Sequence, residues 1–365
     1  MRICVAECRN ATGRLSRRAC VFVKGNILLR AIQGWIGTGL AVTLMAYGGM
    51  ACATEITGAG SSFGAPIYGA WGEDAARDLD VTLNYQTIGS GAGQNQVRAR
   101  TVDFGASDAP MSATALEAAH LAQFPTVMGA IVPVVNLPGV ADGRLHLTGA
   151  LLAQIYDGEI TSWNDARIAA VNPGLALPDI PVAPVRRADG SGTTFVFTSY
   201  LSLSWPAWKA QEGAGTSIQW PVGEGARGND GIAAAVRNTE GSIGYLEYAY
   251  AVGNHMTMVE MRNSHGEDVA ANSDSFEAAA RSAKWDEGVT RHVDVLDAAG
   301  QGAWPIMAAT YVLIPTDPRD HARGRAVRDF FAWAFARGDE TARRLQYVPL
   351  PEEVKTGIVG FLKQE

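Results

Sequence analysis

The segment that most constrains the fold is an apolar run, a glycine-rich turn and a second apolar run in direct succession. Residues 180–185 predict a strand, and residues 194–201 predict a helix. The turn between them carries Arg187, Asp189 and Ser191. Because the N–H groups of a first helical turn lack helical partners, they form an anion site together with the positive end of the helix dipole. The alternative is an ordinary turn in which Ser191 only caps the helix.

Two other segments repeat this order of strand, glycine-rich turn and helix. Residues 57–68 place Ser62 at the expected N-cap of a helix, with the Phe63 N–H in its first turn. Residues 81–100 place Ser90 in the loop before another helix. Alternating strands and helices indicate an α/β domain, and ligands of such domains bind beyond the carboxyl ends of strands.

The two longest apolar strands, residues 127–137 and 306–315, lie far apart in the sequence. We expect them to be the chain crossings between two lobes. The first lobe would then comprise residues 54–128 and 306–365, and the second lobe residues 129–305.

The first 53 residues have the composition of a secretory signal. The segment contains seven basic residues and one acidic residue. An uncharged apolar run follows, and Ala51-Cys52-Ala53 provides small residues for cleavage. We expect export to the periplasm and cleavage before Thr54. A lipid anchor on Cys52 is the minor alternative, and an uncleaved membrane anchor also fits the length of the apolar run.

Cleavage at that position would change the chemistry open to the chain. All four cysteines would be lost, which excludes disulfides, cysteine–metal sites and thiol nucleophiles. The remaining chain would hold 23 basic and 36 acidic side chains. So acidic a protein is a poor partner for nucleic acid or anionic lipid.

Four motifs in a fixed order carry a resemblance to a known family. They are Thr57-Gly-Ala-Gly-Ser-Ser-Phe63, Tyr85-Gln-Thr-Ile-Gly-Ser90, Val102-Asp-Phe-Gly-Ala-Ser-Asp-Ala-Pro110 and Arg186-Arg-Ala-Asp-Gly-Ser-Gly-Thr193. With Trp220-Pro-Val-Gly and Gly228-Asn-Asp-Gly-Ile232, they closely resemble the periplasmic phosphate-binding proteins of high-affinity phosphate ABC importers. The resemblance extends from about residue 54 to the C-terminus.

The resemblance implies a fold, a function and partners. The fold is a two-lobed α/β periplasmic-binding-protein fold of type II-like topology, with the ligand in a cleft between lobes joined by two hinge strands. The function is capture of inorganic phosphate and its delivery to an ABC permease with a cytoplasmic ATPase. The resemblance also implies a monomer that is not an enzyme and holds no cofactor and no metal.

The resemblance further implies which residues contact phosphate. They are Ser62, Phe63 through its N–H, Ser90, Asp108, Arg187, Ser191, Gly192 and Thr193, with Asp189 supporting the arginine. Ser62 stands where the family usually has threonine, so the hydroxyl is kept. Gly64 replaces a usual proline, which affects the geometry of the helix start.

The chemistry of phosphate assigns a role to Asp108. Phosphate near neutral pH keeps a proton that needs an acceptor, whereas sulfate has none. Our hypothesis is that Asp108 accepts this proton and therefore excludes sulfate, because two negative groups would otherwise be in contact. The alternative role of Asp108 is a cap on a turn at a strand end.

The sequence leaves other functions open besides phosphate capture. The site could bind another tetrahedral oxyanion, arsenate more readily than sulfate, or the fold could serve as a surface scaffold. A secreted phosphatase with Ser191 as its nucleophile would need a base or a metal. The six histidines are scattered without the spacing of metal ligands, so we expect no catalysis.

Overall fold

The computed structural model describes residues 53–286 and 288–364. The predicted signal sequence up to Cys52, and with it the alternative of a lipid anchor, lies outside the described residues. These described residues form one compact unit. Within the described ranges, no helix has the length and apolar character that a bilayer crossing requires.

A mixed sheet runs through this unit in the order β2-β1-β3-β14-β4-β8-β6-β7, and β9 pairs with β4. Its strands are β1 (Thr54–Gly60), β2 (Val81–Thr87), β3 (Phe104–Ser107), β4 (Leu121–Val135), β6 (Ala183–Arg187), β7 (Glu224–Ala226), β8 (Ser242–Glu247), β9 (Thr257–Met258) and β14 (Met307–Pro315). Strand β1 lies parallel to β2 and β3, and β6 lies parallel to β7 and β8. Two small ladders comprise β5 (His146–Leu147), β10 (Glu260–Arg262) and β11 (Asp268–Val269), and β12 (Lys284–Trp285) with β13 (Val293–Asp294).

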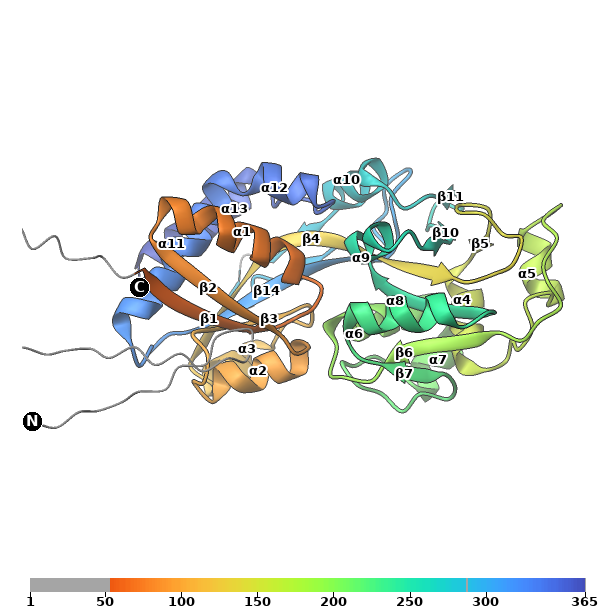
Figure 1. Cartoon of the computed structure of the whole chain (residues 1–365), viewed down its shortest axis with the longest axis horizontal. Helices are drawn as coiled ribbons and strands as arrows, with labels where there is room; N and C mark the ends of the chain where they lie inside the picture. The colour runs from red at the N-terminus through yellow and green to blue at the C-terminus, as the bar shows by residue number, and fades with distance from the viewer. Residues whose placement is uncertain (1–52, 287, 365) are drawn as a thin grey trace, which may run out of the picture. The chain divides into compact units, whose positions relative to one another are not determined.

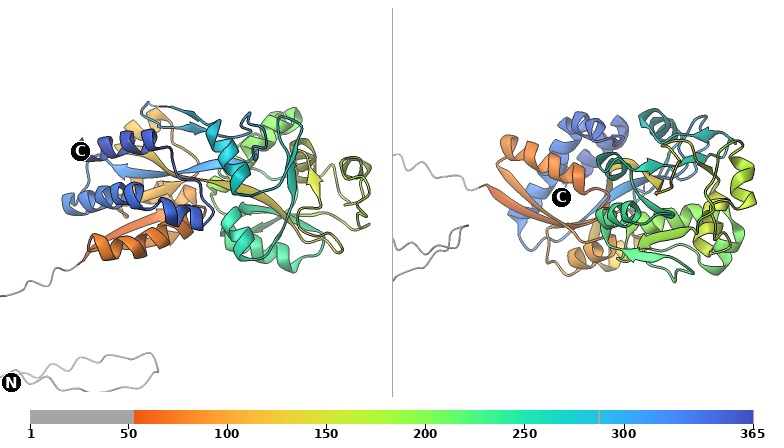
Figure 2. Two further views of the ribbon diagram at one scale, coloured as in Figure 1. Left: turned by 90° about the horizontal axis from the view of Figure 1, so that it is seen from above. Right: turned by 45° about the vertical axis from the view of Figure 1, so that its right-hand side comes forward.

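Strand β4 connects the two parallel parts of this sheet. Residues 121–130 pair antiparallel with β14 except at Thr126, where the register shifts, and the last five residues pair antiparallel with β8. All of its residues are buried, which explains why its sequence is apolar on both faces, apart from Gln123 and Thr126, and does not alternate. In Figure 1 and Figure 2, β4 runs from the group around β1–β3 to the group around β6–β8.

Helices cover both groups of strands. They are α1 (Ala65–Asp78), α2 (Ser90–Arg98), α3 (Ala113–Ala118), α4 (Gly149–Asp157), α5 (Ala166–Val171), α6 (Gly192–Ser204), α7 (Pro206–Gln211), α8 (Gly228–Asn238), α9 (Tyr248–Gly253), α10 (Ser273–Arg281), α11 (His321–Arg337), α12 (Asp339–Arg344) and α13 (Glu352–Gln364). Helix α1 packs on β2 and α11 on β1, whereas α8 packs on β6 and β8. The predicted α/β class is confirmed. The lobe limits after residues 128 and 305 stay a prediction.

Two helix starts differ from the sequence-based expectation. Helix α1 begins at Ala65, and its N-cap is Gly64 without a side-chain hydrogen bond, so the assignment of Ser62 as N-cap is wrong. The reason is Pro66, whose fixed φ and missing N–H suit the first helical turn and place the start there. Helix α2 begins at Ser90, so Ser90 lies in the first turn and not in the preceding loop.

Candidate anion-binding site

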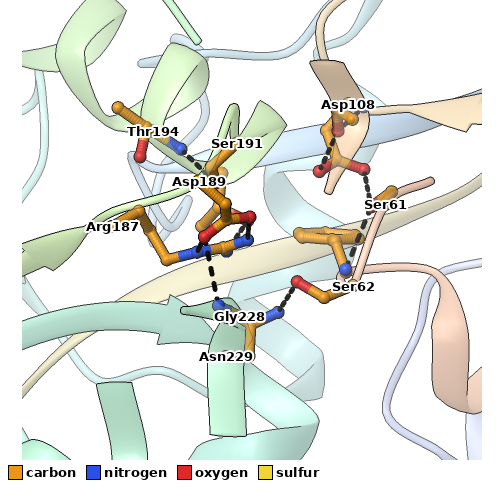
Figure 3. A network of polar contacts seen from close by, with 12 residues as sticks. Ser61, Ser62, Asp108, Arg187, Asp189, Ser191, Thr194, Gly228 and Asn229 are labelled. Carbon is orange, nitrogen blue, oxygen red and sulfur yellow. Dashed lines mark hydrogen bonds and ion pairs between the residues drawn. The ribbon is translucent and has the colours of Figure 1, made fainter. Parts of the chain in front are cut away.

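The predicted ligand residues come from distant segments and lie in one buried region. Each of the eight is buried: Ser62, Phe63, Ser90, Asp108, Arg187, Ser191, Gly192 and Thr193. Figure 3 shows Asp108 and Ser61 on one side of this region, and Arg187, Asp189 and Ser191 on the other. Four turns, which follow β1, β2, β3 and β6, therefore meet here, as expected for strand ends of an α/β domain.

Arg187, the last residue of β6, is held in one orientation by Asp189. Its Nε donates to Asp189 Oδ1 at 2.8 Å, and its Nη2 donates to Asp189 Oδ2 at 2.5 Å. The two side chains are only 1% and 7% exposed. Asp189 Oδ1 also accepts the Gly228 N–H at 3.1 Å. Because a bidentate pair fixes the plane of the guanidinium, the remaining Nη1 is aimed at Thr193 Oγ1, 3.4 Å away.

Thr193 belongs to the first turn of α6, the helix that follows this arginine. Ser191 is its N-cap, and Ser191 Oγ accepts the Thr194 N–H at 3.1 Å. Capping satisfies one of the free N–H groups, whereas those of Gly192 and Thr193 have no partner within the helix. The positive end of a 13-residue helix thus lies beside the guanidinium.

Asp108, directly after β3, faces this helix with only one of its two carboxylate oxygens. Its Oδ1 accepts from Ser61 Oγ at 2.6 Å and from Thr310 Oγ1 at 2.8 Å. Its Oδ2 is 3.5 Å from Ser90 Oγ. A Cβ placed on Gly192 would lie 2.6 Å from Asp108 Oδ2. Asp108 Oδ2 therefore points at the start of α6, and only glycine fits opposite it.

The surroundings shift the pKa of this carboxyl into the physiological range. Burial raises the pKa of Asp108 to about 6, although the hydrogen bonds from Ser61 and Thr310 and the charge of Arg187 act in the opposite direction. Asp108 can therefore exist with or without a proton near neutral pH.

Hydrogen bonds join the two sides of the site. Asn229 Nδ2 donates to Ser62 Oγ at 3.1 Å, and the Tyr250 hydroxyl donates to Ser62 O at 2.9 Å. The Gly91 N–H donates to Gly190 O at 2.9 Å. Ser62 is thus bonded through its side chain to α8, which follows β7, and through its backbone to α9, which follows β8, so the site is shut in this structure.

One predicted ligand group already has an internal partner. The Phe63 N–H donates to Ser61 Oγ at 2.9 Å, and the Phe63 carbonyl accepts from the Tyr347 hydroxyl at 2.6 Å. The assignment of Phe63 N–H as a phosphate donor therefore stays a prediction, since a ligand would have to share it with Ser61.

The chain is similar to a known domain family and to named proteins. The model of the PBP superfamily domain matches residues 46–337. The phosphate-binding protein PstS of Xylella fastidiosa (strain Temecula1) is 45% identical over 311 residues, 85% of this chain and 85% of that protein. PstS of Haemophilus influenzae is 46% identical over 313 residues, 86% of this chain and 94% of that protein. The chain belongs to the PBP superfamily and, within it, to the PstS family.

Solved structures agree with this PstS assignment at the level of fold. A high-affinity periplasmic phosphate-binding protein with bound phosphate superposes with a TM-score of 0.68 at 21% identity, over 84% of this chain and 93% of that chain. A phosphate ABC transporter substrate-binding protein from Clostridium perfringens gives a TM-score of 0.61 at 16% identity, over 82% and 100% of the two chains. The family and the two-lobed fold inferred from the motifs are therefore confirmed.

Four residues that shape this PstS-family site were missed by sequence reasoning. Ser61 and Thr310 bind Asp108, while Asn229 and Tyr250 bind Ser62. Thr310 offered a signal, because it is a polar residue within the apolar run of β14. Asn229 lay in a motif that carried the resemblance but received no role. Ser61 likewise lay in the motif of residues 57–63 without receiving a role, whereas Tyr250 offered no local signal.

A cavity of about 190 Å³ adjoins the site beside Asp108. Phe195 of α6, Tyr311 of β14 and His292 are among its lining residues. Its volume is sufficient for water molecules. The buried carboxyl of Asp108 therefore borders a space that water can occupy.

Proposed function

We propose that this chain is an extracytoplasmic solute-binding protein that captures inorganic phosphate and delivers it to an ABC-type permease. The observation that carries the proposal is the opposition of Asp108 Oδ2 to the start of α6 and to Arg187. One proton acceptor faces a group of fixed donors, which is the pattern that a protonated tetrahedral oxyanion requires. The names of the PstS relatives support the same ligand.

In this proposal each ligand residue has a defined task. Arg187 and the N–H groups of Phe63, Gly192 and Thr193 donate to phosphate oxygens, as do the hydroxyls of Ser62, Ser90, Ser191 and Thr193. Asp108 accepts the phosphate proton. Sulfate would bring an unprotonated oxygen against this carboxylate, and the unmet acceptor disfavours it. Arsenate has nearly the shape and protonation of phosphate and is the alternative ligand.

The transport cycle follows from the strand that both groups share. Residues 54–128 and 306–365 would move as one lobe and residues 129–305 as the other, by bending at β4 and β14. Breaking the hydrogen bonds of Ser62 and Gly91 would open the site toward the permease. The basic and apolar leader supports a periplasmic location, and we propose a monomer that meets permease subunits coupled to a cytoplasmic ATPase.

We propose that the protein catalyses no reaction. Ser191 Oγ accepts the Thr194 N–H as the cap of α6, so its geometry serves the helix start. A phosphatase would additionally need a base on Ser191 or a bound metal. Release of p-nitrophenol from p-nitrophenyl phosphate at a rate that Ser191→Ala abolishes would contradict this part of the proposal.

Calorimetric titration tests the proposed ligand. The purified protein is stripped of bound ion and titrated with phosphate, arsenate and sulfate at pH 7.5 in turn, with nitrate as a control anion of different shape. We expect tight 1:1 binding of phosphate and no measurable heat from sulfate. Absence of phosphate binding, or equal binding of sulfate, would overturn the assignment.

A further inference from the structure

The two oxygens of Asp108 have different surroundings, and the difference comes from two hydroxyl groups. Oδ1 accepts from Ser61 Oγ at 2.6 Å and from Thr310 Oγ1 at 2.8 Å. Oδ2 lies opposite Gly192 and accepts one long hydrogen bond, from Ser90 Oγ at 3.5 Å. Ser61 and Thr310 are themselves buried, so no bulk water replaces them at Oδ1.

The direction of the Ser61 hydrogen bond is fixed by the backbone. Ser61 Oγ accepts the Phe63 N–H at 2.9 Å, so its own single proton is free to point at Asp108. A hydroxyl has one proton to donate, and a carboxylate oxygen has only lone pairs. With two donated hydrogen bonds, Oδ1 is a poor place for an additional proton. A proton on Asp108 therefore belongs on Oδ2, the oxygen that faces the ligand.

We propose that Ser61 and Thr310 are specificity-determining residues that position the Asp108 carboxylate, reserving Oδ2 as the acceptor for the ligand's proton. The inference rests on the proposed function. Neither residue belongs to the ligand set inferred from the family resemblance. Both act through Asp108 and are therefore positioning residues.

The proposal has a consequence for the discrimination between phosphate and sulfate. When Asp108 is ionised it repels sulfate, and when it is protonated Oδ2 can donate to a sulfate oxygen. Sulfate affinity should therefore rise as the pH falls. Hydrogen bonds to the charged form favour ionisation, so loss of either hydroxyl should move this rise to higher pH.

Other groups near Asp108 must be held constant in such an experiment. The phenols that face it are Tyr68, Tyr85, Tyr250, Tyr311 and Tyr347, and burial raises the pKa of each, so they keep their protons below pH 8. The other charged or titratable neighbours are Arg187, Glu247 and, on the cavity wall, His292 and Asp294. Ser61→Ala and Thr310→Val leave all of these groups in place. A difference in the pH dependence of sulfate affinity between the variants and the unchanged protein therefore reports the protonation of Asp108.

The test compares sulfate and phosphate affinities of the purified full chain from pH 5 to pH 8. In Ser61→Ala and in Thr310→Val, the pH at which sulfate binding appears should rise by about one unit, or about tenfold in sulfate affinity at fixed pH. Thr310→Ser keeps the hydroxyl and should behave as the unchanged protein. Thr57→Val is the matched control, because the Thr57 hydroxyl donates to a different carboxylate, that of Asp103, at 2.9 Å.

A second measurement does not depend on ligand binding. The carboxyl of Asp108 is titrated by carbon-13 NMR in the ion-free protein, with Asp108→Asn to assign its signal. An upward shift of the titration in Ser61→Ala and Thr310→Val, together with the shifted sulfate profile, supports the proposal. An unchanged titration or an unchanged sulfate profile overturns it. If the unchanged protein binds no phosphate at any pH, the proposed function fails, while the NMR titration still decides whether Ser61 controls the carboxyl.

Discussion

Asp108 and Asp189 are two buried aspartates of one site with opposite acid–base character. Burial acts on both to raise the pKa, and it prevails for Asp108, whose pKa is about 6. For Asp189, burial is outweighed by the hydrogen bonds and charge of Arg187, so its pKa lies below the ordinary value. The difference teaches that burial alone does not determine the charge of a carboxyl. The presence of a directly bonded guanidinium decides it.

The two aspartates also affect stability in opposite directions. A carboxyl with a lowered pKa stabilises the fold above its unfolded pKa and loses that contribution as the pH falls. A carboxyl with a raised pKa costs stability as the pH rises toward its folded pKa. Asp189 therefore stabilises the fold as the charged partner of Arg187, whereas ionisation of the buried Asp108 costs stability, and in our proposal this cost accompanies its role as a proton acceptor.

The largest expected effect comes from removing the guanidinium that distinguishes the two aspartates. Arg187→Ala leaves Asp189 buried without its cation, and breaking a buried pair typically costs ~3–5 kcal/mol of stability. Phosphate affinity should fall as well, by about 1.5–3 kcal/mol for a lost charge-assisted hydrogen bond. Urea unfolding and calorimetric titration measure the two losses.

The chain contains a matched exposed pair for this variant. Arg167 bonds Asp165 through Nε at 2.9 Å and Nη2 at 2.8 Å, with its side chain 41% exposed. Arg167→Ala should cost ~0–1 kcal/mol, because water replaces the partner. Equal losses of unfolding free energy in Arg167→Ala and Arg187→Ala would show that burial does not increase the contribution of the Arg187–Asp189 pair to stability.

An intermediate effect is expected when Asp108 loses the ability to accept a proton. Asp108→Asn keeps an oxygen for Ser61 and Thr310 but presents N–H donors to the ligand. Phosphate binding should weaken by about 1–3 kcal/mol, and sulfate binding should become measurable at pH 7.5. A titration in which sulfate and phosphate compete for the site gives the ratio of the two affinities. Asp103→Asn, which alters a carboxyl that accepts from Thr57, is the control and should leave the ratio unchanged. An unchanged ratio in Asp108→Asn would refute the acceptor role.

The smallest expected effect extends the comparison to a third buried acid, Glu247 at the end of β8. Burial raises the pKa of Glu247 to about 8, from 4.5 in a model peptide, although the Ala249 N–H donates to its Oε2 at 3.0 Å. Within the described part of the chain, its Oε1 has no hydrogen-bond partner. The folded protein thus holds a proton that the unfolded chain has released, and stability should fall as the pH rises, by about 1.4 kcal/mol per pH unit for one proton.

Glu247→Gln should remove this slope. Urea unfolding between pH 6.5 and pH 8 is the suitable measurement, because Asp108 titrates mainly below that range. We expect the midpoint of the unchanged protein to decline across the range and that of the variant to stay level. Parallel declines would mean that Glu247 is ionised in the folded protein.

Sequence reasoning predicted the parts of the site that depend on short-range order. Arg187 and Asp189 are two residues apart, and Ser191 precedes an apolar helix, so their contacts follow from local geometry. The Ser61–Asp108 contact spans 47 residues and depends on β1 lying beside β3 in one register. The start of α1 was misplaced because Ser62 is a good cap by residue type, while Pro66 sets the actual start. A single sequence does not reveal which strands pair and in which register. It also does not reveal which of two nearby helix-start residues determines the first residue of a helix.

The close approach of Gly192 to Asp108 and Ser90 has a kinetic consequence. A single added carbon on Gly192 would already lie 2.6 Å and 2.5 Å from their oxygens, and the Gly91 N–H is bonded to Gly190 O nearby. An ion held behind such contacts cannot diffuse out while they persist. The opening rate of the protein would then set a minimum lifetime of the complex. Variants with weakened ligand contacts would release phosphate no faster than the protein opens.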